Sequence, residues 1–435
     1  MKAQFRRLVA GYFEWLTVYT IKRYRLKVVA IVGSIGKTST KMAVAAVLGQ
    51  KYRVLVHQGN YNSEIGLPLS VFELTVPRTL FNPVAWLLKM IQAWWRSRRY
   101  KYEVLVLELG TDTPGDLAKF WRYLQPDIGV VTAVAPEHMA NFPDGLDEVA
   151  AEELSIGDHC ARLIAAHDEI PETYRRRYIA HLKHHTYYGQ NVESGYSYRS
   201  KLTAEGSQLS IKDNGSFVLQ NHSVALLGPT AAQSLVAAWA VGQALGLTQH
   251  QLTKGLATVR PVAGRLNPLA GINDARLIDD TYNSSPQAVR EALALLALSP
   301  VADAGRRIAV LGSMNELGAN AHMYHEEVGQ EAAGVDLLVT IGDLAERWLG
   351  PAAVAAGLDP TRYKPADSPY AAGAFLRTTL RAGDVVLIKG SQNGVFAEEC
   401  TKLLLADPAD VAQLVRQSPE WLQIKKRQFT DRVST

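Results

Sequence analysis

Residues 33–39 constrain the fold of this chain most strongly, because they join an expected strand to an expected helix. The β-branched run at residues 27–32 predicts a buried parallel strand, and residues 38–48 have helical composition. Strand, turn and helix in this order direct backbone N–H groups and a helix N-terminus toward phosphate oxygens. The segment reads Gly33, Ser34, Ile35, Gly36, Lys37, Thr38 and Ser39. It therefore predicts a phosphate-binding loop in an α/β sheet.

The Gly-Lys-Thr core of this loop has a defined chemistry. Lys37 is expected to bridge the β- and γ-phosphates of a nucleotide, and the Thr38 hydroxyl is expected to ligate Mg²⁺. The full G-x-x-x-x-G-K-[ST] pattern is not met, because Ile31 occupies the position of the first glycine. A chance glycine turn with an exposed Lys37 is the structural alternative.

Buried-strand patterns recur along the chain and alternate with helical stretches. They lie at residues 104–107 and 128–131, and again at 276–278, 307–311, 337–341 and 385–388. Shorter, more polar strands at 193–227 predict a small antiparallel sheet. This pattern predicts an α/β fold: a P-loop-containing, parallel-sheet ATPase domain with a small antiparallel subsheet, followed by a Rossmann-like α/β C-terminal domain.

The helical pattern of residues 230–258 ends near Arg260, after which a new series of strands begins. We therefore expect a basic amphipathic segment at residues 1–27, an ATP-binding domain at 28–260 and a Rossmann-like domain at 261–435. A basic aromatic insertion at residues 80–101 interrupts the ATP-binding domain.

The composition is that of a globular protein kept inside the cell. The chain has 435 residues, of which 47% are hydrophobic, enough for two or three domains. Its two cysteines, Cys160 and Cys400, have no spacing typical of a disulfide framework or a zinc site. No apolar run approaches the roughly 20 residues that span a bilayer, and no signal peptide is recognisable.

Positive charge is concentrated in two aromatic-rich segments. Residues 1–27 carry seven Lys or Arg against the single acid Glu14, and residues 89–101 carry five bases and no acid. The rest of the chain has a net charge of −7. This mixture is typical of helices at the surface of an anionic membrane. The alternative is that both helices cover the body of the protein and turn basic faces outward.

Two further candidate residues follow predicted strands. Glu108 ends the strand at 104–107, where a carboxylate could hold Mg²⁺ at the edge of a parallel sheet. His138 follows the strand at 128–131 and would lie at the same edge. A histidine in a loop is more often a surface or capping residue, so His138 alone is weak evidence.

Six motifs follow one another along the chain, and their combination is informative. They occupy residues 33–39, 60–68, 108–110, 136–138, 279–286 and 310–318. In this order they resemble the Mur ligase family over about residues 28–400, and most closely its MurF type, which adds D-alanyl-D-alanine to a UDP-N-acetylmuramoyl tripeptide. The motifs around Asn283 and Met314 point to this type.

The resemblance implies which residues form the site. The phosphate and first Mg²⁺ positions correspond to Lys37, Thr38, Ser39 and Glu108, and His138 would help to hold a second Mg²⁺. Positions that reach the nucleotide from the C-terminal domain correspond to Arg265, Asp280 and Asn283, so domain closure would complete the site. Expected substrate contacts are Asn60, Asn62 and Lys389.

The resemblance also implies the reaction. A peptide carboxylate would attack the γ-phosphate of ATP, and an amine would then attack the acyl phosphate, with Mg²⁺ as cofactor. The implied partners are a muramoyl peptide and a dipeptide amine, and no nucleic acid. One alternative is a Mur-like subunit that activates a carboxylate for ammonia, although such relatives often carry a four-cysteine zinc insertion. The other is a membrane-associated nucleotide-binding scaffold.

Three departures from the family pattern affect these expectations. Aligning residues 145–153 places Glu153 where members carry a carbamylated lysine, so Glu153 is expected to bind the second Mg²⁺ directly; an exposed helix acid is the alternative. Thr230 and Ala231 replace a His-Asn pair, and Ala133 replaces an asparagine.

Only residues 1–27 precede the expected ATP-binding domain, so a UDP-binding N-terminal domain is not expected. We expect a membrane-proximal or lipid-linked substrate, and a cytoplasmic protein that can lie at the inner face of the membrane.

Overall fold

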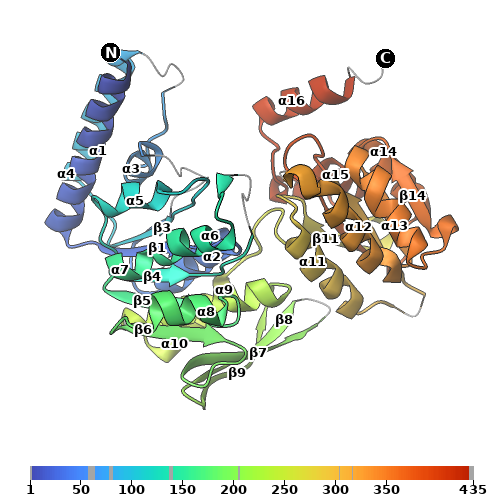
Figure 1. Cartoon of the computed structure of the whole chain (residues 1–435), viewed down its shortest axis with the longest axis horizontal. Coiled ribbons are helices and arrows are strands. Elements are labelled where there is room, and N and C mark those ends of the chain that lie inside the picture. Colours follow the sequence, from blue (N-terminus) through green and yellow to red (C-terminus); the bar gives the residue numbers. More distant parts are fainter. Residues whose placement is uncertain are drawn as a thin grey trace. The chain divides into compact units, whose positions relative to one another are not determined.

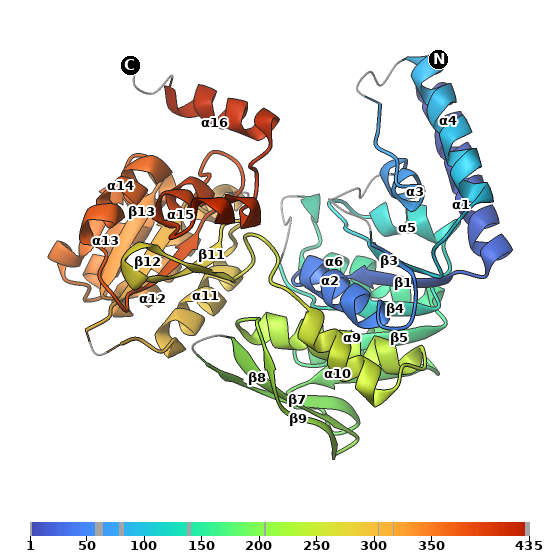
Figure 2. The same ribbon diagram turned by 180° about the vertical axis from the view of Figure 1, so that it is seen from behind.

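The chain forms two compact units, each built around its own sheet (Figures 1 and 2). The computed structural model describes residues 2–56, 64–77, 82–136, 141–203, 206–302, 304–315 and 317–430. The main division lies between Val259 and Arg260, and residues 201–208 and 223–228 are also assigned to the second unit.

The first unit contains a nine-stranded sheet in the order β2-β3-β1-β4-β5-β6-β7-β8-β9. The pairs from β2 through β7 are parallel. β8 and β9 are joined by the tight turn Asn214–Gly215 and form a hairpin. The strands are β1 (Lys27–Val32), β2 (Val54–Val56), β3 (Val104–Glu108), β4 (Ile128–Val131), β5 (Arg162–Ala166), β6 (His185–Gly189), β7 (Gly195–Leu202), β8 (Ser207–Asp213) and β9 (Ser216–Val224).

Helices cover both faces of this parallel region, which explains why β1 and β3 are apolar runs rather than alternating patterns. The helix α2 packs against α9 and α10 on one face. Side chains of α1, α3, α4, α5 and α6 share a core with the other face. The helices are α1 (Lys2–Tyr24), α2 (Lys37–Leu48), α3 (Gly66–Val71), α4 (Pro83–Arg98), α5 (Asp116–Trp121), α6 (Leu146–Leu154), α7 (Ile156–His159), α8 (Glu172–Tyr174), α9 (Pro229–Ala244) and α10 (Gln249–Thr258).

The second unit is a doubly wound α/β sheet in the order β10-β11-β15-β12-β13-β14, parallel except at β10. α11, α12 and α13 cover one face, and α14 and α15 the other. The strands are β10 (Asn267–Ala270), β11 (Arg276–Asp280), β12 (Arg307–Gly312), β13 (Leu337–Ile341), β14 (Tyr363–Ala366) and β15 (Val385–Lys389). The helices are α11 (Pro286–Leu298), α12 (Ala321–Glu331), α13 (Gly350–Ala355), α14 (Pro369–Thr379), α15 (Glu398–Leu404) and α16 (Pro419–Thr430). The predicted fold class is confirmed.

The two basic aromatic segments form adjacent helices, α1 and α4 (Figures 1 and 2). They run in the same direction, because the Tyr12 hydroxyl donates to the Met90 carbonyl and the Tyr24 hydroxyl to the Arg98 carbonyl. α1 buries Phe13 completely in the core of the first unit, where its ring meets Trp86 edge-on. Along most of its length α1 therefore covers the body of the first unit, as the alternative predicted. In the described part of the chain, no helix combines the length and apolar character needed to cross a membrane.

The buried face of α1 gives a stability prediction. Phe13→Ala should lower the free energy of unfolding of the first unit by about 3 to 5 kcal/mol, because it leaves a cavity in a packed core. Leu8→Ala, on the exposed side of the same helix, should change it by only about 0.5 kcal/mol or less. Urea denaturation followed by tryptophan fluorescence measures both. Equal, small effects would show that α1 is not part of the core.

Candidate functional site

The predicted phosphate loop lies between β1 and α2, as the strand–turn–helix pattern requires. Gly33 and Gly36 adopt φ values of 125° and 84°, in the left-handed region that favours glycine. A side chain at Gly33 would also overlap Thr132, which follows β4. Among the described residues no side chain caps the start of α2, and no acid lies in its first turn. The first N–H groups of a twelve-residue helix are thus directed toward this loop.

Lys37 is half-buried and folds back onto its own loop. Its ammonium donates to the Gly33 carbonyl at 2.5 Å and to the Ser34 carbonyl at 3.3 Å. Carbonyl contacts of this kind hold the ammonium group at the loop, where it can exchange them for phosphate oxygens. Ile35 and Ser39 are also half-buried.

Glu108 is the acid nearest to this loop, and two residues of α2 bind it. The Thr38 hydroxyl donates to Oε1 of Glu108 at 3.0 Å, and the Lys41 ammonium lies 2.8 Å from Oε2. Burial tends to raise the pKa of Glu108, but the charge of Lys41, with Lys37 and the Thr38 hydroxyl, outweighs it, and the pKa lies below its ordinary value. Glu108 is therefore ionised at neutral pH.

This pair of oxygen ligands fits Mg²⁺. A hydroxyl and a carboxylate next to a phosphate site are hard oxygen donors, and Mg²⁺ in nucleotide sites usually binds one or two carboxylates, phosphates and water. In the described part of the chain no group of three or more His, Cys, Asp or Glu could hold a metal by itself. His138, Asn60 and Asn62 lie outside the described residues.

Lys41 was missed by the sequence reasoning. It is only 2% exposed, and its partner Glu108 is 5% exposed, so the two charges compensate each other in the interior. The sequence did hold a signal for Lys41, because it follows Lys37 by one helical turn and therefore lies on the same face of the expected helix.

Glu153 on α6 also contacts the phosphate loop, at its first residue. Its side chain is buried, and Oε2 accepts the Gly33 N–H at 2.6 Å. The alternative of an exposed helix acid is therefore wrong. Metal binding by Glu153 stays a prediction, and the contact with the first residue of the phosphate loop is an additional role that the sequence did not indicate.

The departures from the family pattern lie close to the phosphate loop. Thr230 is the second residue of α9 and would touch a side chain added at Gly36. Ala133 accepts the Ser34 N–H through its carbonyl at 3.0 Å. These replacements change groups beside the loop without altering its backbone.

In the second unit, the structure brings four predicted residues together at the ends of β11 and β15. Lys389 binds the Asp280 carboxylate at 2.6 Å and the Asn283 carbonyl at 3.0 Å. The Arg265 guanidinium lies 4.2 Å from the centre of the Tyr282 ring. Lys389 is buried, so in this structure it orders the segment that carries Asn283. Direct substrate contact by Lys389 stays a prediction.

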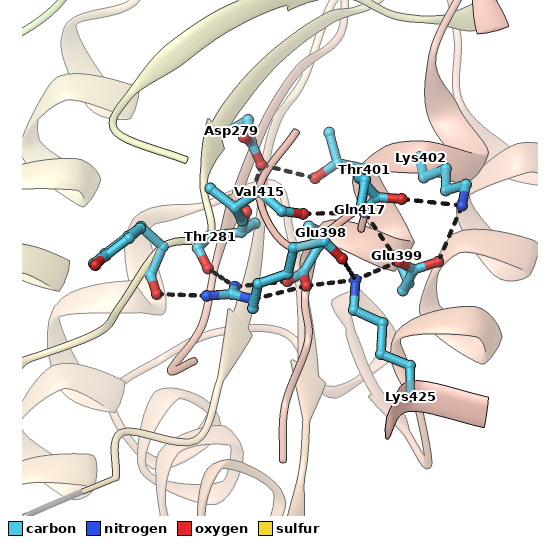
Figure 3. Close-up of polar contacts among 11 residues, drawn as sticks. Asp279, Thr281, Glu398, Glu399, Thr401, Lys402, Val415, Gln417 and Lys425 are labelled. Atoms are coloured by element: carbon cyan, nitrogen blue, oxygen red, sulfur yellow. Dashed lines mark hydrogen bonds and ion pairs between the residues drawn. The ribbon is translucent and has the colours of Figure 1, made fainter. Parts of the chain in front are cut away.

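A second buried cluster, which the sequence reasoning also missed, contacts the backbone carbonyls of this segment (Figure 3). Arg416 binds the Glu398 carboxylate at 2.8 Å and donates to the carbonyls of Thr281 and Tyr282. Lys425 on α16 reaches Glu398 at 2.7 Å and Glu399 at 2.6 Å. Removing one partner from such a network would leave a buried charge without compensation, at a cost of about 3 to 5 kcal/mol.

Asp279 anchors the start of the same segment. Its fully buried carboxylate accepts the Gly264 N–H at 3.0 Å and the hydroxyls of Thr281 and Thr401 at 2.8 and 3.1 Å. Burial raises the pKa of Asp279 to about 7, although both hydroxyl contacts oppose this shift.

Comparison with known proteins identifies the family. The family model "Mur ligase middle domain" matches residues 31–242, and the model "Mur ligase, glutamate ligase domain" matches residues 264–392. This chain belongs to the Mur ligase family. The predicted family resemblance is therefore confirmed, and the two matches fall on the two sheets described above.

Relatives of this Mur ligase are known in sequence and structure. It is 28% identical to the UDP-N-acetylmuramoyl-tripeptide–D-alanyl-D-alanine ligases of Synechocystis sp. and of Bacillus subtilis. The match to the Synechocystis ligase covers 90% of this chain and 77% of that ligase, and the match to the Bacillus ligase covers 88% and 76%. MurF from Thermotoga maritima, solved with ADP, superposes with a TM-score of 0.71 at 23% identity, covering 91% of this chain and 83% of that one. MurF from Acinetobacter baumannii gives the same TM-score and identity, covering 90% and 79%.

The raised pKa of Asp279 predicts how the stability of this Mur ligase depends on pH. Between about pH 4 and 7 the unfolded chain ionises this carboxyl while the folded chain keeps it protonated, so rising pH removes stability. Asp279→Asn should lose this contribution, and its stability deficit relative to the wild type should shrink as the pH rises through that window. Thermal unfolding of both proteins across the pH range measures this. A deficit that grows with pH would show that folded Asp279 is ionised.

Proposed function

We propose that this protein is an ATP-dependent, ADP-forming ligase of peptidoglycan precursor synthesis, joining a peptide carboxylate to an amine through an acyl phosphate. The observation that carries the proposal is the contact of Thr38 and Glu108 at the start of α2, in a chain whose relatives are named as such ligases. This contact supports a nucleotide site with a bound metal ion rather than a loop that binds phosphate alone.

The chemistry requires that two anions approach each other. A carboxylate attacks the γ-phosphate of ATP, ADP leaves, and the amine then attacks the acyl carbon and expels phosphate. Mg²⁺, held by Thr38 and Glu108, would supply charge neutralisation. The N–H groups at the start of α2 and the Lys37 ammonium would bind the phosphate oxygens and stabilise the charge that develops there.

Residues of the second unit complete the proposal. We assign Arg265, Asp280 and Asn283 to nucleotide binding, and the network of Lys389 and Arg416 to holding their segment in place. His138, Asn60 and Asn62 keep their proposed roles in metal and substrate binding. By analogy with the named relatives, the proposed substrates are a muramoyl tripeptide and D-alanyl-D-alanine.

The proposed location follows from the substrates. ATP is available in the cytoplasm, and we propose that the enzyme works there, in peripheral contact with the inner face of the membrane through residues 1–27 and 80–101.

An amine panel tests the proposed reaction. Purified protein, ATP, Mg²⁺ and a UDP-muramoyl tripeptide are combined with D-alanyl-D-alanine, with ammonia or with no amine, and phosphate release and the peptide product are measured. Turnover that depends on the dipeptide is expected. Turnover with ammonia alone would replace the proposal with an amidating enzyme, and no turnover with any amine would contradict it.

Glu153 offers a second prediction, because its two possible roles can be separated. Glu153→Gln keeps an oxygen that can accept the Gly33 N–H but removes the negative charge. If Glu153 binds Mg²⁺, this variant should need roughly tenfold more Mg²⁺ for half-maximal ATP turnover, as Glu108→Gln should. The exposed acid Glu172, changed to Gln, is the matched control. An unchanged Mg²⁺ requirement in Glu153→Gln, together with lost activity in Glu153→Ala, would restrict Glu153 to ordering the loop.

A further inference from the structure

The helix α4 turns an apolar face toward solvent. Its large exposed apolar side chains recur at helical spacing, and they are Val84, Leu87, Leu88, Ile91, Trp94 and Trp95. The opposite face of the helix, with Trp86, Ala93 and Ser97, is buried against the first unit. Leu88 is 55% and Trp95 56% exposed, so this apolar stripe of six side chains lies on the surface and is not the edge of the buried core. Contiguous exposed apolar surface of this kind marks an interaction site.

The neighbouring helix extends this surface. Trp15 of α1 is 57% exposed, and its ring lies 6.0 Å from that of Tyr12. Tyr12 itself contacts α4, because its hydroxyl donates to the Met90 carbonyl, so Trp15 lies beside the junction of the two helices. Two helices therefore contribute to the apolar surface.

The charges around the stripe indicate what covers it. Residues 74–102 contain no Asp or Glu and six Lys or Arg. At the C-terminal end of α4, Arg98 stacks on Trp94 at 4.8 Å, and Arg99 and Lys101 are exposed. The end of α1 lies beside them, as the contact of Tyr24 with Arg98 shows, and adds the exposed residues Lys22, Arg23 and Arg25.

A pocket of about 320 Å³ opens where the apolar stripe meets these cations. Its lining includes Trp95, Arg96, Arg99, Tyr100, Lys101 and Tyr102. Arg96 is already bound to the carbonyls of Phe72 and Glu73, at 2.6 and 2.8 Å, and so holds α4 on the body. Arg99 and Lys101 present the positive charge of the pocket to solvent, although Glu73 lies 3.9 Å from Lys101.

We propose that the outward face of α4 binds the surface of an anionic lipid bilayer. The apolar stripe would enter the boundary between headgroups and acyl chains, with the helix lying in the membrane plane. Arg99 and Lys101 would meet lipid phosphates, and the tryptophans would lie at headgroup depth. Glu73 is the one acid that lines the pocket, against Arg96, Arg99 and Lys101, and residues 74–102 contain no acid; this excess of positive charge favours lipid phosphate over a protein partner of mixed charge. This surface is separate from the phosphate loop, and the proposal deepens the peripheral location proposed above.

Vesicle co-sedimentation of the full chain tests the proposal without any measurement of catalysis. The wild type is expected to sediment with phosphatidylcholine vesicles that contain phosphatidylglycerol, and to bind less at high salt. Leu88→Glu/Ile91→Glu should weaken this binding roughly tenfold or more, because two charges enter the apolar stripe. Arg99→Gln/Lys101→Gln should weaken binding to the anionic vesicles only.

The matched control is Phe217→Glu/Leu298→Glu, which places the same charges on exposed apolar residues elsewhere. It should bind vesicles like the wild type. Circular dichroism and thermal unfolding establish that each variant is folded. Absence of wild-type sedimentation with anionic vesicles would overturn the proposal. So would a stripe variant that binds vesicles normally but dissociates a dimer in size-exclusion chromatography, since the stripe would then join copies of the chain. The amine panel contains no lipid, so its failure is distinguishable from failure here.

Discussion

The phosphate site depends on the buried carboxylate of Glu108, which ends β3 beside the loop. In the interior such a charge is stable only when opposite charge and hydrogen-bond donors surround it, and Lys41 and Thr38 supply one contact to each oxygen. Both residues belong to α2, whereas Glu108 ends β3. Charge compensation therefore also fixes the start of α2 against the sheet. The loop before α2 runs close to Thr132 and Thr230, so a side chain at Gly33 would overlap the first and one at Gly36 would touch the second.

The second unit stabilises its candidate site in the same way, with more residues. Asp280 and Lys389 neutralise each other at the ends of two neighbouring strands, and Arg416 holds the carbonyls just beyond β11. Arg416 is held in turn by Glu398 on α15. The segment before Asn283 is thus fixed by side chains from distant parts of the chain, which is how a loop can carry a defined geometry.

Local features could be predicted from the sequence, and long-range contacts could not. The phosphate loop was recognisable because strand, glycine turn and helix are adjacent in sequence, and the apolar runs predicted both parallel sheets. Composition could not tell that Phe13 points into the core while Trp15, two residues later, points outward. The bond between Glu153 and Gly33 joins residues 120 positions apart, and no local pattern indicates it.

The parallel pairing of α1 and α4 has a mechanical consequence. Phe13 of α1 and Trp86 of α4 pack in the same core as the residues of β1, directly before the phosphate loop. Neither helix can therefore pivot on a flexible tether. If α4 is immobilised on a surface, the shared core also fixes the orientation of β1 relative to that surface. The direction in which the phosphate loop opens is then fixed as well, because the loop follows β1 directly.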